Sequence, residues 1–320
     1  MNVERKKLTG LQLKRKAGNV IANIARYVFL LSVGYVILYP MFSMISVSLK
    51  TEEAFMDATA FWIPSEITFD HFVHAFSVLK YKDSVVTTLL VEVVSAALEV
   101  ISCGVVAYGF ARFEFRGKRI CEFILLAQIL IPMQVYIVSI LTTYVSFDIF
   151  GILGAFYRAT GIDLRFRLYN TYFTMYLPSI LAVGIKAGIM IYIYKQFFKG
   201  FPKELEEAAS VDGAGPIKTF IKIMIPSSGV VILTVSIFAL IWHWNDFQIA
   251  MMYFDRNHPL AVMLADIENL LSINNQWTSW VVKDAVKMAS CVIFILPVLI
   301  VYLLVQNKFI RSIDKVGITG

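Results

Sequence analysis

The sequence predicts an all-α protein that crosses a membrane with about six helices, and two observations support this class. Hydrophobic residues make up 58% of the chain and charged residues only 16%, whereas about a quarter of a soluble domain is charged. The apolar residues also form unbroken stretches as long as the roughly 20 residues that a helix needs to cross the hydrocarbon core. Because these stretches lack the alternating pattern of membrane strands, we expect helices and not a barrel.

Six stretches are candidate spans, and only two of them contain a Lys, Arg, Asp or Glu. They are residues 27–49, 84–111, 123–147, 168–194, 223–245 and 288–307. The second contains Glu92 and Glu99, and the fourth contains Lys186. The first is too long for a cleaved signal and has no small-residue cleavage pattern, so we expect it to be retained as a helix.

The distribution of Lys and Arg predicts the orientation of these spans. Nineteen of these residues fall on the side of the two termini and nine on the other, with Lys186 left inside a span. The positive-inside rule then places both termini in the cytoplasm. This gives a cytoplasmic segment 1–26, a transmembrane domain 27–307 with a cytoplasmic loop 195–222, and a cytoplasmic tail 308–320. The net charge of +6 therefore reflects topology in lipid, and no nucleic-acid partner is expected.

The sequence offers little for catalysis or metal binding. Its three cysteines, Cys103, Cys121 and Cys291, lie in or beside apolar segments and make an odd number, which argues against a disulfide framework or a metal cluster. His243 has no second histidine or carboxylate at ligand spacing. The motifs of zinc proteases and of serine hydrolases are absent from the sequence. We therefore expect no catalytic residue and no metal.

The polar loop 195–222 contains the signals of a short helix. Pro202 suits a first helical position, and three glutamates in residues 204–207 favour the positive end of a helix dipole. Gly213 can adopt the left-handed conformation that ends a helix. The helix between Pro202 and Gly213 is too short to cross a bilayer.

The same loop resembles the EAA loop of binding-protein-dependent ABC importer permeases. Glu207-Ala208-Ala209 is followed after three residues by Gly213, and after nine more by Ile223-Met224-Ile225-Pro226, where the family usually has Leu at position 225. Residues 107–117, Ser48 to Thr51 and Trp244 to Phe247 are similar to the carbohydrate branch of that family, the MalG-like permeases.

This resemblance implies a type I importer permease of the MetI-like fold, in a bacterial inner or plasma membrane, that imports sugars and specifically oligosaccharides. Its implied partners are a second, MalF-like permease subunit, an ATPase dimer and an extracytoplasmic sugar-binding protein. The chain has no phosphate-binding loop, so ATP and Mg would be bound by the ATPase and no cofactor by this chain.

The resemblance assigns contact with the ATPase to Glu207, Ala208, Ala209, Asp212 and Gly213. Glu207 would make polar contacts, the two alanines would allow close approach, and Gly213 would permit the turn back to the membrane. The alternative is that Glu207 only complements the helix dipole.

Seven residues are candidates for the translocation pathway: Glu92, Glu99, Lys186, Trp242, Trp244, Asn245 and Asp246. The two glutamates are seven residues apart and share a helical face, with Lys186 as their expected partner. This group could be an ion pair that fixes helix packing or a substrate or ion site. The aromatic and polar residues at 242–246 could contact sugar, or anchor or gate the fifth span at the interface.

Other interpretations stay open at the level of sequence. A permease for a peptide or a polyamine would share the EAA loop, and a membrane-embedded enzyme with dispersed catalytic residues is a further alternative. An apparent insertion at residues 156–167 could contact a binding protein or be decoration. The tail 308–320 stops earlier than the family's tail, which reaches the ATPase.

Overall fold

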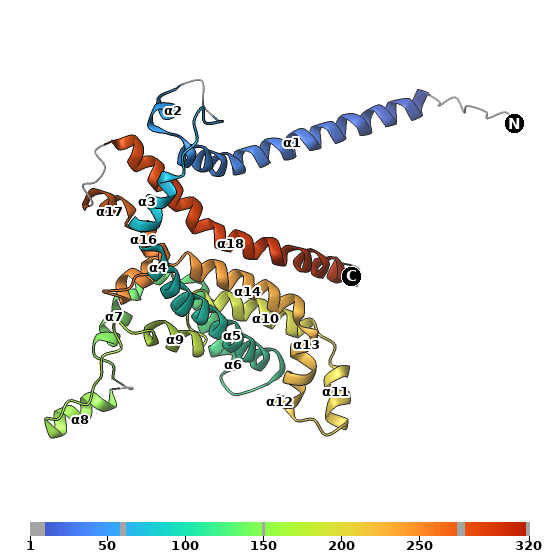
Figure 1. Cartoon of the computed structure of the whole chain (residues 1–320). Coiled ribbons are helices and arrows are strands. Elements are labelled where there is room, and N and C mark those ends of the chain that lie inside the picture. Colours follow the sequence, from blue (N-terminus) through green and yellow to red (C-terminus); the bar gives the residue numbers. More distant parts are fainter. Residues whose placement is uncertain (1–9, 58–61, 149–150, 274–278, 318–320) are drawn as a thin grey trace. The chain divides into compact units, whose positions relative to one another are not determined.

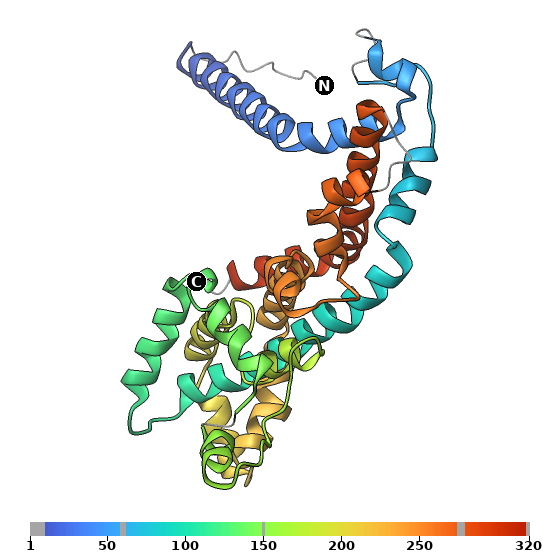
Figure 2. The same cartoon turned by 90° about the vertical axis from the view of Figure 1, so that its left-hand side faces the viewer.

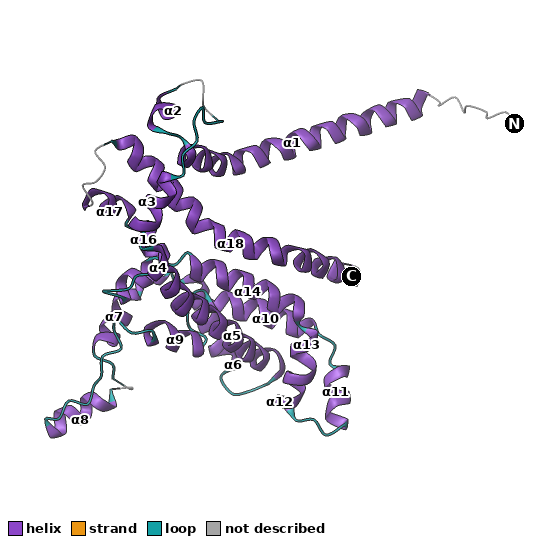
Figure 3. Cartoon of the chain, in the orientation of Figure 1, coloured by secondary structure: helices purple, strands orange, loops and turns teal. Residues whose placement is uncertain are grey.

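The structure, a computed structural model, describes residues 10–57, 62–148, 151–273 and 279–317. Within these ranges every regular element is a helix, as the colouring of Figure 3 shows, and extended backbone occurs only as isolated bridges. The predicted all-α class is therefore confirmed. Residues 1–9 of the predicted N-terminal segment and 318–320 of the predicted tail lie outside the described residues.

The helices vary from single turns to forty residues (Figure 1). In chain order they are α1 (Gly10–Leu49), α2 (Glu52–Met56), α3 (Asp70–Val78), α4 (Tyr81–Thr88), η1 (Leu89–Val93), α5 (Val94–Arg112), α6 (Lys118–Leu130), η2 (Met133–Val135), α7 (Ile137–Val145), α8 (Ile152–Thr160), α9 (Phe173–Ile180), α10 (Ala187–Gly200), α11 (Glu204–Val211), α12 (Pro216–Thr219), η3 (Phe220–Met224), α13 (Ile225–Ser227), α14 (Gly229–Trp244), α15 (Gln248–Tyr253), α16 (Leu260–Ala265), α17 (Ile267–Ile273) and α18 (Trp280–Gly317). Of the η elements, η1 and η3 are π-helices and η2 is a 3₁₀ helix.

The chain forms two compact units, and each is described by itself. The first comprises residues 1–74 with 276–292. Its long helix α1 exposes most of its apolar side chains, as expected for a helix that faces lipid or other proteins. The hydroxyl of Thr51 caps α2 by accepting from the amide of Ala54 at 3.2 Å. The buried ring of His71 on α3 donates from Nε2 to the carbonyl of Lys50 at 3.0 Å, which joins α3 to the end of α1.

The second unit comprises residues 75–275 with 293–320, and its core is formed by three helices. Helices α5, α10 and α14 lie side by side (Figure 1 and Figure 2). Small buried residues at their contacts, such as Ala107 on α5 and Ala239 on α14, allow the backbones to approach closely. A Cβ atom at Gly104 would lie 3.8 Å from the ring of Tyr194 on α10. Small residues thus set the spacing of the core helices.

Three continuous helices in the described residues are long and apolar enough to cross a bilayer. They are Gly18–Leu49, Tyr81–Arg112, which includes α4, η1 and α5, and Trp280–Asn307. A fourth candidate is the pair Pro216–Ser227 and Gly229–Trp244, which is bent by 80° at the break. Pro226 and Ser228 lie at this bend, where proline removes a backbone donor. The predicted span 223–245 is therefore straight only from Gly229.

The two remaining predicted spans are made of shorter helices. In 123–147, helix α6 ends at Leu130 because Pro132 disfavours helical backbone in the residue before it, and α7 follows from Ile137. In 168–194, α9 and α10 are separated by residues 181–186, where Ala182 and Lys186 have φ angles of 57° and 59°. These left-handed residues break the helix inside the apolar segment.

Candidate functional site

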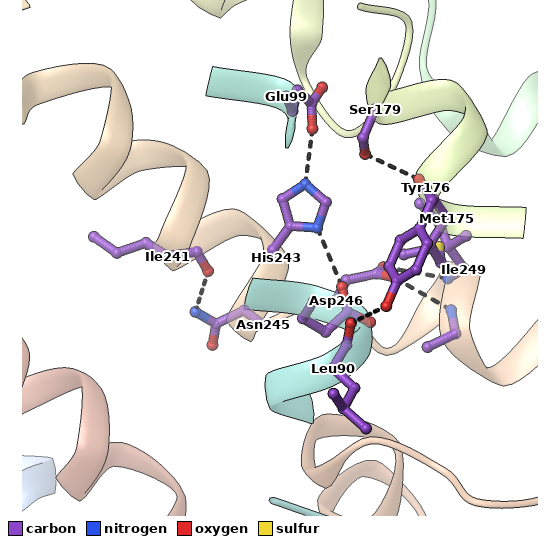
Figure 4. Close-up of polar contacts among 12 residues, drawn as sticks. Leu90, Glu99, Met175, Tyr176, Ser179, Ile241, His243, Asn245, Asp246 and Ile249 are labelled. Carbon is purple, nitrogen blue, oxygen red and sulfur yellow. Dashed lines mark hydrogen bonds and ion pairs between the residues drawn. The ribbon is translucent and has the colours of Figure 1, made fainter. Parts of the chain in front are cut away.

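A buried cluster of three ionisable side chains links α14 to the helix formed by α4, η1 and α5. Nδ1 of His243 on α14 lies 3.2 Å from Oε2 of Glu92, and Nε2 lies 2.7 Å from Oε2 of Glu99. All three side chains are almost completely buried. Figure 4 shows the imidazole of His243 directed at Glu99. Donation to both ionised carboxylates requires the imidazolium form, because a neutral imidazole has only one N–H.

The shared face of Glu92 and Glu99 is confirmed, but the expected partner was wrong. Their partner is His243, and Lys186 makes no ion pair within the described residues. The reason is the break between α9 and α10: Lys186 stands at the start of α10 with an exposed side chain, so it does not enter the packed interface.

Two local features of the backbone, a π-helix and a glycine, lie at the two ends of this cluster. Glu92 lies in the π-helix η1, a rare local widening that often occurs at functional positions. Gly184 lies against Glu99: a Cβ atom there would come within 2.8 Å of Oε1 and 2.9 Å of Oε2. A side chain at position 184 would therefore require the Glu99 carboxylate to move from its present place beside His243.

A pocket of about 370 Å³ opens beside this cluster. Its walls are formed by the end of α6 with the following 3₁₀ turn, the start of α10, and the end of α14 with the start of α15. Lys186, Trp242, Asn245 and Asp246 all line it. The structure thus brings together four of the seven residues that were predicted for the pathway.

The other three predicted pathway residues lie elsewhere. Glu92 and Glu99 are in the buried cluster, and Trp244 is buried, with its indole N–H donating to the carbonyl of Phe294 at 3.2 Å. Trp242 is half-buried and stacks on Phe238, with ring centroids 5.4 Å apart. The two tryptophans, two residues apart, therefore face different surroundings.

The helix predicted in the polar loop is α11, Glu204–Val211. It begins two residues after Pro202, and Gly213 ends it with a φ of +76°, as the sequence predicted. Ala209 is buried, whereas Glu207, Ala208 and Asp212 are exposed. Because nothing in the described chain covers these last three, one face of α11 remains open.

The opposite side of α11 is fixed to the end of α5. Glu206 Oε1 lies 2.5 Å from Nε of Arg112, and its other oxygen accepts a hydrogen bond from the hydroxyl of Tyr108 at 3.3 Å. Arg112 also donates from Nη2 to the carbonyl of Phe201 at 2.8 Å. The arginine side chain is only 7% exposed, so this ion pair is shielded from solvent and fixes α11 relative to α5.

Sequence reasoning missed the roles of His243, Glu206 and Arg112. A signal existed for His243: it is the one ionisable residue in an otherwise uncharged span, and such residues usually face a polar partner. No signal existed for the pairing of Arg112 with Glu206, because they are 94 residues apart in the chain and lie among other charged residues of the same loops.

The insertion at 156–167 forms most of α8 and the turn after it. Arg165 pairs with Asp163 at 2.8 Å, and its guanidinium lies 5.1 Å from the ring centre of Tyr157. The hydrogen bond from Arg165 lowers the pKa of Asp163 to about 2. The insertion is also joined to the segment before it, because the amide of Phe147 donates to the carbonyl of Phe166 at 2.9 Å.

Residues 101–315 match the family of binding-protein-dependent transport system inner membrane components. The chain belongs to this family. It is a component of a transport system and not an enzyme, and the predicted family is confirmed. The match includes α10, α11, α14 and the second half of α5, so the polar loop and His243 lie in the part that the family shares, whereas Glu92 and Glu99 precede it.

The permease also resembles individual members over nearly its whole length. It is 27% identical to the LplC protein of Bacillus subtilis, covering 93% of this chain and 94% of LplC. It is 27% identical to the trehalose transport system permease protein SugB of Mycobacterium tuberculosis, covering 91% and 95%. A bacterial transporter for import of the acidic polysaccharide alginate has the same fold, with a TM-score of 0.67 and 22% identity over 91% of this chain and 98% of that one.

Removal of the histidine from the buried cluster should destabilise the permease. In the His243→Leu variant two carboxylates lose their counter-charge, which costs about 3–5 kcal/mol for a buried pair. The fraction of protein that stays monodisperse in detergent after heating should fall. The triple variant Glu92→Met, Glu99→Met, His243→Leu should recover most of the loss, because it removes all the charges at similar volume. Equal heat resistance of the single variant and the wild type would contradict this role.

Gly184→Ala should weaken the same cluster through steric contact alone. Its added methyl group would push the Glu99 carboxylate away from His243, a form of overpacking that costs about 1–3 kcal/mol. Gly104→Ala is the matched control, because its methyl group would meet only Tyr194 at ordinary contact distance. The same heating assay should show a loss for Gly184→Ala and none for Gly104→Ala, and equal behaviour of the two would refute the close approach.

Arg112→Ala should release α11 from α5. Hydrogen exchange of the amides of residues 204–211 should accelerate at least about tenfold, because hydrogen bonds to charged groups contribute about 1.5–3 kcal/mol. Lys118→Ala is the control, since Lys118 pairs with Glu114, whose side chain is 89% exposed. Unchanged exchange in Arg112→Ala would show that α11 is held by other contacts.

Proposed function

We propose that this chain is the permease subunit of an ATP-driven, binding-protein-dependent importer of sugars, with oligosaccharides as its substrates. The observation that carries this proposal is the two-sided environment of α11. One side of the helix is fixed to α5 through Arg112 and Glu206, and the other exposes Glu207, Ala208 and Asp212. Because α11 is fixed to α5 on one side and exposed on the other, a partner protein that binds the exposed side could transmit its movement to α5.

The partner that fits this face is an ATPase, which supplies the energy that this chain does not. Apolar side chains on the helix and on the following α12 are also exposed: Leu205 and Val211 of α11 are 47% and 88% exposed, and Ile217 of α12 is 76% exposed. They offer an apolar surface around the polar Glu207, while Ala208 allows close approach and Gly213 permits the turn back towards α14. ATP and Mg would be bound by that ATPase, whose open and closed states must hold α11 differently for nucleotide to change the permease.

The membrane arrangement follows from the charge distribution. In the proposed topology, segment 1–26, the loop 195–222 and the tail 308–320 are cytoplasmic, and residues 27–307 form the transmembrane domain. The complex would sit in a bacterial inner or plasma membrane. It would include a second permease subunit similar to MalF, and an extracytoplasmic sugar-binding protein would deliver substrate to the opposite side. The insertion 156–167 is on that side and is available to this protein.

The pocket beside the buried cluster has the chemistry of a sugar site. The C–H faces of a sugar stack on an aromatic ring, and its hydroxyl groups need hydrogen-bond partners. Trp242 supplies a ring, and Gln128, Gln134 and Asn245 supply amide groups on the walls of the same pocket. SugB, a relative of similar length, is named for trehalose transport, which agrees with a sugar as substrate. Peptides and polyamines are the alternative substrate classes, and the uptake experiment below tests both.

Transport by the whole importer tests this function. Cells that express the complete importer are given labelled oligosaccharides of two to five units, neutral and acidic, together with a labelled oligopeptide and a polyamine. We expect uptake of sugar only, dependent on this chain. Glu207→Lys should abolish uptake while the protein remains in the membrane, because it reverses a charge on the open face of α11.

Glu204→Lys is the matched control for this experiment, since Glu204 lies in the first turn of the same helix but outside the coupling motif. It should transport at nearly the wild-type rate. Normal uptake by the Glu207→Lys variant would rule out the coupling role, and uptake of peptide or polyamine in place of sugar would rule out the substrate class.

A further inference from the structure

Lys186 is a charge in an apolar segment without a counter-charge. It lies in the break between α9 and α10 in a left-handed conformation, with a φ of 59°. Its side chain is exposed and lines the pocket, and its ammonium group has no ion-pair or hydrogen-bond partner among the described residues. Both a charge at membrane depth and a left-handed backbone without glycine are unfavourable. Their combination points to a functional role.

The acidic groups nearby already have other partners. Among the residues that the structure describes, Asp246 is the only acidic one that lines the pocket. Its carboxylate oxygens accept from the amides of Ile249 and Ala250, each at 3.2 Å, at the start of α15. Glu92 and Glu99 are paired with His243. Within the described residues, none of these three carboxylates forms an ion pair with Lys186, so its ammonium group can pair with a ligand.

The backbone around Lys186 adds to its positive potential. The pocket is lined by the N-terminal end of α10, a helix of 14 residues, where the helix dipole favours a negative group. Two glycines at this end, Gly184 and Gly188, line the pocket without a side chain that would cover the backbone. Broken helices whose N-terminal ends face anionic substrate groups are a recurring design of transporters.

The remaining walls suit a sugar ring. Trp242 lines one side, and the amides of Gln134 and Gln248, joined by a hydrogen bond of 2.8 Å, line another. A ligand that satisfies all the walls carries hydroxyl groups, a C–H face and one negative charge. A uronic acid unit has these three features together.

We propose that this pocket binds the carboxylate of an acidic sugar through Lys186, so that the permease transports oligosaccharides that contain uronic acid. This inference rests on the proposed function as a sugar importer and names the class of sugar. Lys186 makes the ion pair with the sugar carboxylate, Trp242 packs on the ring, and the amides hold the hydroxyl groups.

The test compares two probes with the same sugar chain, one with free carboxylates and one in which methyl esters remove the negative charges. Labelled trigalacturonate and its fully methyl-esterified form are given, below saturation, to cells that express the complete importer. The variants are Lys186→Gln, Lys186→Arg and the control Lys80→Gln, a second lysine in left-handed conformation (φ 44°) that does not line the pocket. An immunoblot of the membranes measures the amount of each variant.

We expect wild-type cells to import trigalacturonate. Lys186→Gln should lower its initial rate about tenfold or more, the loss of one well-placed charged contact, and leave the rate for the methyl ester within about twofold of wild type. Lys186→Arg should keep most of the trigalacturonate rate, and Lys80→Gln should change neither rate.

Three results would overturn the inference, and they are distinguishable. Import of neutral oligosaccharides but not of trigalacturonate by the wild type would refute an acidic substrate and leave the sugar importer intact. An equal loss for both probes in Lys186→Gln at normal protein level would assign the lysine to structure. Absence of uptake of every sugar by the wild type would instead refute the proposed function.

Discussion

The contact of His243 with two glutamates is the constraint on which the second unit depends. In a membrane, apolar burial gives helices little reason to associate, because lipid tails are as apolar as leucine side chains. A buried charge without a partner is costly in the same setting. The Glu92–His243–Glu99 cluster therefore determines which face of α14 meets α5. The small residues at the same interface then allow the two backbones to pack closely.

The breaks in the helices follow from the same constraint. Irregular backbone at membrane depth is tolerated only where it is buried in protein or lines a cavity. The second half of the break meets this condition: Gly184 lies against Glu99, and Gly184, Ile185 and Lys186 line the pocket. The break thus lacks helical hydrogen bonds but places Lys186 and backbone groups on the pocket wall. The contact of Gly184 with Glu99 attaches this part of the wall to the buried cluster.

Much of this architecture was predictable from the sequence, and the rest was not for identifiable reasons. Long apolar runs predicted the helical class, and Gly213 predicted the end of α11, because both signals are local. The partner of Glu92 and Glu99 was mispredicted because a lysine is always considered as a counter-charge, whereas a histidine is often neutral. Tertiary packing, which the sequence does not reveal, places His243 between the two glutamates. The interruption at 181–186 contains Gly184 and follows Pro178, which are weak local signals, but its two left-handed residues, Ala182 and Lys186, are residue types that rarely adopt this conformation, so their positions were not predictable.

The continuous helix formed by η1 and α5 connects α11 with α14, which the proposed function requires to move together. Arg112 at one end is paired with Glu206 of α11, and Glu92 and Glu99 towards the other end contact His243 of α14. Arg112 follows Glu92 by twenty positions, so the two are about 30 Å apart along the helix at about 1.5 Å per residue, which is about the thickness of the hydrocarbon core. Ion pairs with strict geometry resist bending more than apolar contacts do, since a small displacement leaves a charge unpaired. A force on α11 would therefore move α5 and α14 as one body, and the pocket wall that α14 provides would move with them. Through such rigid-body motion, an ATPase that does not contact the substrate could change the accessibility of the pocket.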